Sequence, residues 1–517
     1  MALGLARSNS PHMSATSDQQ PTFGRILKYT GIFGGVQGFN VLMAMLRGKV
    51  AALLLSTNGV GLIANFGRAT EWISAATNGG LAFSAVQHIA QLHARGNERA
   101  LAHYVCLLRS WIVIAALLGA LIMAVGAPYW SAFYFGHTHF AGQFVWLALL
   151  VALTTLNGGE LAVLKGTRQI KRMAMVSTLS AVFTLLISAA AYWQWGVRAI
   201  VPALLLSAAA LFALQVRSAH RAVPYRLRLG SWRFLRKGRG MIRLGIAYAL
   251  ANFVAIGGES LVRAFIMRFP EAAGLGADFG GSQAIGIYST AMTLTITYSR
   301  LIFMSMDAEY YPRLSAHVHD LGLQNATINR QIDVLVLLVA PFALVYAMAL
   351  PLVVPMLFTT QFLPAVDMVL GGMLLLLFKA IATPIAYLSL AHARSRMYFW
   401  VEGTYTLALA LLTPAAYYYY GFLGAGLALS LSEGAYLLVV WAVYGRCFAF
   451  AFESSTRRHI ALQLLLVAAG LFACIALPLA WRLAAAGCCA LFSAAYSWRI
   501  LSHSAHVPER LRRWWKR

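Results

Sequence analysis

The chain is a succession of apolar blocks, each about 20 residues long, separated by short polar segments. A helix of roughly 20 apolar residues spans the ~30 Å hydrocarbon core of a bilayer, so each block predicts one transmembrane helix. We expect fourteen spans, at 27–48, 59–86, 104–126, 141–163, 173–193, 197–216, 241–267, 284–305, 332–356, 363–390, 398–418, 421–444, 460–479 and 482–500. The last two spans, separated only by Ala480 and Trp481, are also compatible with one long re-entrant segment. The pattern predicts an all-α polytopic membrane protein.

The composition supports this prediction. The 517 residues are 60% hydrophobic and 11% charged, and their mean hydropathy is +0.69. Soluble domains carry about a quarter charged residues, and this chain has too few to coat a soluble surface. Composition therefore excludes a soluble globular protein.

The formal net charge of +25 is concentrated in alternate loops. The loops at 127–140, 357–362 and 418–421 contain no Lys or Arg, whereas most of the basic residues lie in the loops of the other set. This alternation follows the positive-inside rule, so we expect an even number of spans with both termini in the cytoplasm. The basic charge then sets the topology, and we expect no nucleic acid partner.

The longest basic linker divides the expected spans into two sets of six, with a final pair added. We expect a disordered cytoplasmic tail, an N-terminal six-helix bundle, a basic linker, a C-terminal six-helix bundle, an additional helix pair and a basic amphipathic tail, at 1–23, 24–216, 217–240, 241–445, 446–503 and 504–517.

The two halves also contain a short internal repeat, at an offset of 225 residues. Segment 60–66 (VGLIANF) aligns with segment 285–291 (IGIYSTA) at this offset. With an even number of spans in each half, the repeats are parallel and related by an axis along the membrane normal. Transporters of this construction bind substrate between their halves and rock them to alternate access.

Six cations fall inside the apolar spans or at their ends, and they are the candidate substrate-binding residues. They are Arg47, Lys49, Arg68, Arg263, Arg300 and Lys379. A charged side chain at mid-membrane costs roughly 3 kcal/mol on insertion scales, so such residues usually face a watery cavity inside the protein. Arginine offers a planar donor fork to phosphate oxygens, and lysine a compact point charge. These residues predict a cationic cavity for a phosphate or diphosphate headgroup.

A purely structural explanation remains open for several of these cations. Arg47 and Lys49 could snorkel to the membrane surface, and Arg300 could lie at the cytoplasmic interface. Arg68 and Glu71 are three residues apart, and Glu259 and Arg263 four, so each pair can form a structural ion pair on one helix face.

Carboxylates within the spans are candidates for charge partners or for proton-coupling groups. They are Glu71, Glu160, Glu259 and Glu433. We expect no metal and no cofactor, and coupling to a proton or sodium gradient is an open alternative. The chain contains no phosphate-binding loop of the Gly-Lys-Ser/Thr type and no long periplasmic loop for a catalytic domain. We therefore expect a transporter, not an enzyme.

Several segments resemble the O-antigen translocases, the Wzx-type flippases of lipid-linked oligosaccharides. The resemblance extends over roughly 24–445 and is carried by residues 26–38 (ILKYTGIFGGVQG), 60–63 (VGLI), 77–80 (TNGG), 285–288 (IGIY) and 310–315 (YYPRLS). This family belongs to the multidrug/oligosaccharidyl-lipid/polysaccharide (MOP) exporter superfamily. Its fold is two six-helix bundles around a V-shaped central cavity.

The resemblance implies a function in the bacterial inner membrane. A flippase of this family turns an undecaprenyl-diphosphate-linked oligosaccharide, such as an O-antigen unit of lipopolysaccharide, from the cytoplasmic to the periplasmic leaflet. Polysaccharide polymerase and chain-length machinery are then the expected partners. Lys49 and Arg263 match positions where such translocases often carry a cation, and Arg47 resembles a cavity arginine of the lipid II flippases.

Other functions remain as alternatives. A lipid II flippase is disfavoured because residues 74–78 (SAATN) replace the double-arginine segment of that family in the second span. A multidrug exporter of the same superfamily would need acidic cavity residues to attract cationic drugs. A membrane-embedded polymerase or glycosyltransferase is the remaining alternative. By analogy with lipid II flippases, the last two spans are expected to help form a groove for the lipid tail.

Overall fold

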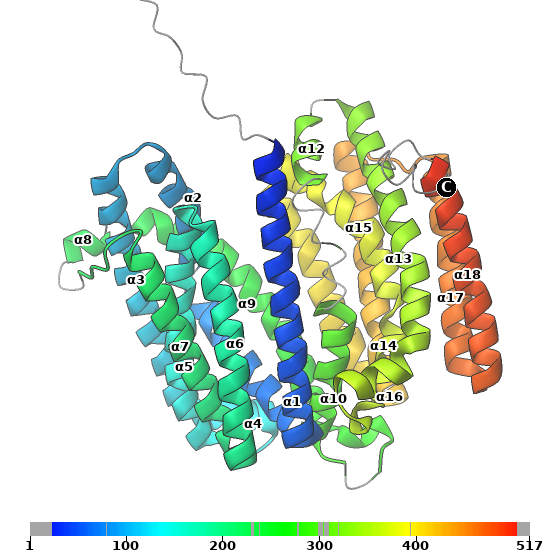
Figure 1. Cartoon of the computed structure of the whole chain (residues 1–517), viewed down its shortest axis with the longest axis horizontal. Coiled ribbons are helices and arrows are strands. Elements are labelled where there is room, and N and C mark those ends of the chain that lie inside the picture. Colours follow the sequence, from blue (N-terminus) through cyan, green and yellow to red (C-terminus); the bar gives the residue numbers. More distant parts are fainter. Residues whose placement is uncertain are drawn as a thin grey trace, which may run out of the picture.

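The structure is a computed structural model that describes residues 23–78, 80–228, 232–236, 238–276, 279–297, 303, 310–318, 320–392 and 394–503. Every regular element within these ranges is a helix. The helices form two bundles side by side, with a final pair against the second bundle (Figure 1). The prediction of an all-α membrane protein is confirmed.

The first bundle contains seven α-helices. They are α1 (Phe23–Asn78), α2 (Leu81–Ala94), α3 (Glu98–Val125), α4 (Ala127–Phe135), α5 (Ala141–Gly166), α6 (Ile170–Trp195) and α7 (Ile200–His220), with the 3₁₀ turn η1 (Gly196–Ala199) before α7. The short helix α8 (Trp232–Arg236) lies in the linker that follows.

The second bundle begins with α9. Its helices are α9 (Arg239–Arg268), α10 (Gly281–Met292), α12 (Tyr311–Ala316), α13 (Leu321–Leu357), α14 (Ala365–Gly372), α15 (Leu374–Ala391) and α16 (Ser395–Phe448). Three short elements connect or extend them: η2 (Pro270–Ala273), the π-helical turn η3 (Thr293–Thr297) and η5 (Thr360–Phe362).

Nine helical runs among the described residues are long and apolar enough to span a membrane. Three of them, Gly35–Asn78, Ile170–His220 and Arg396–Phe448, contain 44, 51 and 53 residues. At 1.5 Å per residue, straight helices of these lengths would be roughly 65–80 Å long, about twice the thickness of the hydrocarbon core. Each contains one residue with positive φ that turns the chain, namely Ser56, Gly196 and Gly421. The count of fourteen spans stays a prediction.

The first helix continues beyond its expected end. The sequence places this end at residue 48, but helical geometry continues to Ser56, where φ is 57°. The sequence left Lys49 as either a cavity residue or a side chain that snorkels to the membrane surface. Instead, the Lys49 amine donates hydrogen bonds to the backbone carbonyls of Pro355, at 2.9 Å, and of Phe358. A partner far along the chain therefore allows a charged residue to remain inside the helix.

The two repeated segments pack against each other where the bundles meet. A Cβ atom on Gly61 in α1 would overlap the carbonyl oxygen of Ser282, and one on Gly286 in α10 would overlap that of Thr57. Both pairs are related by the repeat offset of 225, because Gly61 corresponds to Gly286 and Thr57 to Ser282. The same glycine contact thus occurs twice across a local pseudo-twofold axis. Small residues allow this backbone approach between membrane helices.

Polar contacts join the bundles near the same end, where Figure 1 shows α4 and α10. The Trp72 Nε1 donates to the Phe253 carbonyl at 3.0 Å, and the Tyr134 hydroxyl hydrogen-bonds the Ser260 hydroxyl at 2.9 Å. The start of α1 and the end of α18 lie at the opposite end of the molecule (Figure 1).

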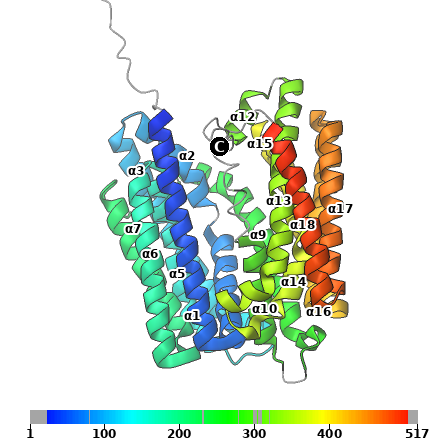
Figure 2. The ribbon, with the colours of Figure 1, turned by 45° about the vertical axis from the view of Figure 1, so that its right-hand side comes forward.

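The last two helices, α17 (Ser454–Ala476) and α18 (Leu479–His503), are separate elements joined at Pro478. They lie side by side against α13 (Figure 2). Gln463 in α17 hydrogen-bonds Ser493 and Ser497 in α18, at 2.6 and 3.0 Å. Two helices of 23 and 25 residues therefore replace the alternative of one re-entrant segment.

A buried ion pair attaches the interdomain linker to the first bundle. Arg109 in α3 donates two hydrogen bonds of 2.8 Å to the two carboxylate oxygens of Glu160 in α5. Its remaining nitrogen Nη1 donates to the carbonyls of Val223 and Pro224, at 3.3 and 2.9 Å, and the guanidinium lies over the Tyr225 ring. Burial raises the pKa of the Tyr225 hydroxyl; Glu160 adds to this effect and Arg109 opposes it.

Further contacts extend this attachment along the linker. The Arg228 amide donates to the Ser110 hydroxyl at 3.1 Å, and Trp111 Nε1 to the Leu235 carbonyl at 3.0 Å. Residues 223–235, where described, therefore belong structurally to the first bundle.

We expect Gly61→Ala and Gly286→Ala to destabilise the protein, because each methyl group would force two helix backbones apart. Overpacking of this kind typically costs about 1–3 kcal/mol. Thermal unfolding of the purified protein in detergent measures the effect. Gly67→Ala is the matched control, since nothing lies within 4 Å of a Cβ at that position of the same helix. Equal unfolding midpoints for all three variants would contradict the close packing.

We expect Arg109→Ala to lower stability by about 3–5 kcal/mol, because it leaves the Glu160 carboxylate buried without its ion pair. The double variant Arg109→Met/Glu160→Leu should recover most of this loss. Both should be cut faster by trypsin within the linker, since both lose the hydrogen bonds to the carbonyls of Val223 and Pro224. The control is Arg99→Ala, which changes an exposed arginine of the same helix. An Arg109→Ala protein as stable as this control would refute the role of the pair.

Candidate substrate-binding site

Two predicted arginines meet at one carboxylate between the bundles. Arg68 Nη2 in α1 lies 2.8 Å from a carboxylate oxygen of Glu259 in α9. Arg263, one turn further along α9, donates to Glu259 Oε1 from Nε and Nη2, at 3.0 and 2.9 Å. Glu71 completes the group, 3.1 Å from Arg68 Nη1. We call Arg68, Glu71, Glu259 and Arg263 the interbundle network.

The interbundle network is partly enclosed and carries no net formal charge. The side chain of Arg263 is 5% exposed and that of Glu259 14%, whereas Glu71, at 58%, is open to its surroundings. Arg263 Nη1 also donates to the Ser289 hydroxyl at 2.8 Å, and its guanidinium lies over the Tyr288 ring. Two positive charges are therefore balanced by two negative ones, and the network links α1, α9 and α10.

Arg47 and Lys49 lie two residues apart on α1 but have different surroundings. The Lys49 amine is bonded to the last carbonyls of α13 (Leu321–Leu357), where the helix dipole favours a cation. Arg47 instead lines a cavity of about 340 Å³, which we call the seam cavity. Lys49 is thus an interbundle contact, and Arg47 a cavity residue.

The seam cavity is lined by helices of both bundles and is open at Arg47, which is exposed. Hydroxyl groups from α6, α7, α10 and η3 line it, including those of Thr184, Ser188, Ser207, Ser289, Thr290, Thr293 and Thr297. Arg47 is the one charged side chain among the described lining residues. The Ser207 and Thr290 hydroxyls are buried without a hydrogen-bond partner in the described chain. The cavity therefore offers one cation and unused hydroxyl groups to a ligand.

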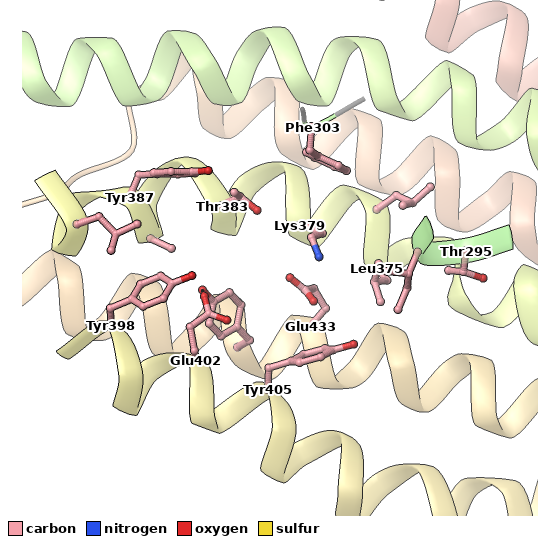
Figure 3. A pocket seen from close by; sticks show the side chains of 15 residues that line it. Thr295, Phe303, Leu375, Lys379, Thr383, Tyr387, Tyr398, Glu402, Tyr405 and Glu433 are labelled. Atoms are coloured by element: carbon pink, nitrogen blue, oxygen red, sulfur yellow. The ribbon is translucent and has the colours of Figure 1, made fainter. Parts of the chain in front are cut away.

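Lys379 lies elsewhere, in a pocket of about 430 Å³ within the second bundle. Helices α15 and α16, the turn η3 and Phe303 enclose this space, which we call the second-bundle pocket. Figure 3 shows Lys379 opposite Glu433, with Tyr405 beside Glu433 and with Tyr398 next to Glu402. The Tyr436 hydroxyl donates to Glu402 Oε1 at 2.5 Å.

The structure thus separates the predicted cations. Arg68 and Arg263 come together with Glu71 and Glu259, whereas Arg47, Lys49 and Lys379 have three different environments. Arg300 lies outside the described residues. Glu160 is the partner of Arg109, and Glu433 faces the second-bundle pocket. No group of three His, Cys, Asp or Glu side chains suited to a metal ion occurs in the described part of the chain.

Sequence reasoning missed Arg109 and the pocket residues Tyr398, Tyr405 and Tyr436. A signal for Arg109 was present. It lies a few residues after the start of one span, and Glu160 a few residues before the end of the next, so a helical hairpin sets them at similar depth. The tyrosines gave no such signal, because aromatic residues are frequent in all spans.

Comparison with known proteins gives the family and the fold. A family model described as "Polysaccharide biosynthesis protein" matches residues 50–367, more than half of the chain. A search of curated protein sequences finds no match.

Solved structures resemble the whole fold at low sequence identity. "Lipid II flippase MurJ, inward closed conformation" has a TM-score of 0.66 and 11% identity, covering 92% of this chain and 100% of that chain. An inward-facing multidrug resistance MATE family transporter of the MOP superfamily has a TM-score of 0.64 and 12% identity, covering 81% and 96%. A MOP superfamily transporter from Pyrococcus furiosus, described as having a binding pocket of reverse polarity, has a TM-score of 0.56 and 13% identity, covering 85% of this chain and 96% of that chain.

These matches confirm the resemblance to Wzx-type flippases at the level of family and fold. The chain belongs to the polysaccharide biosynthesis protein family and has the fold of the MOP-superfamily transporters.

Proposed function

We propose that the protein is a flippase for an undecaprenyl-diphosphate-linked oligosaccharide, the repeat unit of an O-antigen or of another surface polysaccharide. It moves this lipid from the cytoplasmic to the periplasmic leaflet of the bacterial inner membrane. The observation that carries the proposal is the seam cavity, where Arg47 is the one charged side chain among the described lining residues and hydroxyl groups come from both bundles. Phosphate oxygens accept hydrogen bonds from such donors and pair with arginine.

The position of the seam cavity suits alternating access. A diphosphate held there touches both bundles, so rocking one bundle against the other changes the side from which it can be reached. The polyprenyl tail stays in the lipid, since its apolar surface gains nothing from entering a polar cavity.

In this proposal, the interbundle network is a contact that holds the two bundles together at one end of the transporter. Arg68 and Glu259 join α1 to α9 at 2.8 Å. The contact of Gly61 with α10 lies on the same part of α1, after the kink at Ser56. Because the charges of the network balance, a diphosphate gains less there than beside Arg47. Opening the transporter at this end requires these contacts to separate.

The basic loops support the proposed orientation. The linker helix α8, the start of α1 and the end of α18 lie at one end of the molecule (Figure 1). Basic linker and tail segments flank these elements in the sequence, and the positive-inside rule assigns such an end to the cytoplasm.

The energy source belongs to the same proposal. Glu71, Glu160 and Glu259 are engaged in ion pairs with arginines, so their carboxylates are less available to a coupling ion. Glu433 forms no ion pair within the described chain and remains the candidate for coupling to a proton or sodium gradient. Consumption of the flipped unit by a polymerase with its chain-length partner is the other source.

The geometry disfavours the drug-exporter alternative. A cationic drug needs negative charge in its cavity, and the described lining of the seam cavity contains no carboxylate. For a lipid II flippase, the fold similarity to MurJ is favourable, but the segment 74–78 lacks the expected arginines.

We expect deletion of the gene in its native strain to remove the surface glycan and to leave lipid-linked repeat units facing the cytoplasm. Gel analysis of surface polysaccharide and accessibility of the lipid-linked units to an external glycosidase measure both effects. Single repeat units on the surface would indicate a polymerase instead. Loss of peptidoglycan precursor incorporation would indicate lipid II, and sensitivity to cationic drugs with normal glycan would indicate a drug exporter.

We expect Arg47→Ala to reduce surface glycan and to weaken pyrophosphate binding to the purified protein roughly tenfold or more, the loss expected for a charge-assisted hydrogen bond. Arg47→Lys should keep part of this binding, because it retains the charge but not the donor fork. The control is Arg95→Ala, which alters an exposed arginine remote from the cavity. Wild-type glycan and pyrophosphate binding in Arg47→Ala would contradict the role of Arg47.

A further inference from the structure

The second-bundle pocket has the opposite charge balance to the seam cavity. Its described lining contains one cation, Lys379, and two carboxylates, Glu402 and Glu433, so its formal charge is −1. Hydroxyl groups of Thr295, Thr383 and four tyrosines complete the polar lining. The pocket therefore differs in chemistry from the cationic site that Lys379 suggests when its sequence neighbours alone are considered.

Several polar groups of the second-bundle pocket have no partner within the described chain. Glu433 is 4% exposed, and among the described residues no hydrogen bond or salt bridge to it is found, although Lys379 lies opposite it (Figure 3). The Thr295 hydroxyl is likewise buried without a partner. Figure 3 shows the Glu433 carboxylate and the Lys379 amine pointing into the open space between α15 and α16. Buried polar groups are normally hydrogen-bonded, so these side chains indicate a polar ligand.

The charge balance argues against a phosphate or an acidic sugar in this pocket. An anion beside Lys379 would also lie near the two carboxylates, and like charges repel strongly where water is scarce. Glu402 and Glu433 can accept hydrogen bonds but cannot donate them while ionised. Hydroxyl groups of a ligand meet this requirement, since each can donate to a carboxylate oxygen.

The remaining lining suits a sugar ring. Tyr398, Tyr405 and Tyr436 combine an apolar ring with a hydroxyl that can donate or accept. A volume of about 430 Å³ falls in the range of about 300–1,000 Å³ that is usual for small-molecule sites.

The two cavities share one wall, the π-helical turn η3. Thr293 and Thr297 line the seam cavity, and Thr295 and Ile296 line the second-bundle pocket. The two cavities are therefore separated by the thickness of one helix, about 10 Å. A single headgroup whose diphosphate lies in one cavity can place a sugar in the other.

We propose that the second-bundle pocket is a glycan subsite that binds a sugar without negative charge, neutral or amino-bearing, through Glu402, Glu433 and the pocket tyrosines. This inference rests on the proposed flippase function and deepens it, because it divides recognition between two places. The diphosphate binds beside Arg47 and the sugar binds beside Glu433. Lys379 then acts as a hydrogen-bond donor to the sugar and as a counter-charge to the carboxylates.

The test measures the binding of two probes to the full-length protein in nanodiscs. One probe is the strain's own repeat-unit glycan, released from its lipid and dephosphorylated; the other is inorganic pyrophosphate. We expect Glu433→Gln to weaken glycan binding roughly tenfold or more and to leave pyrophosphate binding unchanged. Arg47→Ala should do the reverse. Glu98→Gln, which changes an exposed carboxylate at the start of α3, should match the wild type with both probes.

Two further variants keep the test decisive. Tyr398→Phe removes one hydroxyl from the pocket wall without changing the charge of the pocket, and it should also weaken glycan binding. This variant provides the test if Glu433→Gln fails to fold. Lys379→Met should leave pyrophosphate binding unchanged. Loss of pyrophosphate binding in Lys379→Met would overturn the proposal and make the pocket an anion site.

The failure of this inference differs from that of the proposed function. Surface glycan that survives deletion of the gene would defeat the flippase function itself. Loss of surface glycan on deletion, with wild-type glycan binding in both Glu433→Gln and Tyr398→Phe, would overturn the sugar subsite alone. If the wild type binds pyrophosphate but not the glycan, the sugar subsite is likewise overturned, and the flippase function is not.

Discussion

The cost of charge inside a membrane organises this protein. A cation among apolar helices must be paired, bonded to backbone carbonyls or exposed to an enclosed cavity. Arg109 is paired with Glu160, Arg68 and Arg263 share Glu259, and Lys49 is bonded to the end of α13. These contacts hold the linker, the two bundles and α13 in place.

Two described cations of the candidate set remain without such a partner. Arg47 and Lys379 each point into a cavity, and the cavities differ in their other charged groups. The seam cavity has no carboxylate in its described lining, whereas the second-bundle pocket has two. The same type of charge can therefore serve an anion in one place and balance carboxylates in the other. The surroundings of a cation decide its role.

The repeat gives the contact between the bundles its form. Because Gly61 and Gly286 occupy equivalent positions, each packs on the backbone of the other's helix. Around this backbone contact, Val60 and Ala64 of α1 pack against the core of the second bundle. The interbundle network and the hydrogen bonds of Trp72 and Tyr134 add specificity near it. Because α1 packs closely against α10 and α9 here, a rocking transporter has to separate this packed seam when it opens at this end.

The chain itself determined the all-α membrane architecture, since blocks of about 20 apolar residues leave few other solutions. It also determined the repeat, because Gly61 and Gly286 recur in similar local sequence. The partners of the cations required the tertiary structure. Lys379 has no carboxylate nearby in the sequence, and its neighbour Glu433 comes from another helix. Hydropathy likewise ended the first span at residue 48, just before Lys49, because the carbonyl groups that satisfy the Lys49 amine belong to residues about 300 positions away. Periodicity and hydropathy depend on neighbours along the chain, whereas the environment of a buried charge depends on neighbours in space.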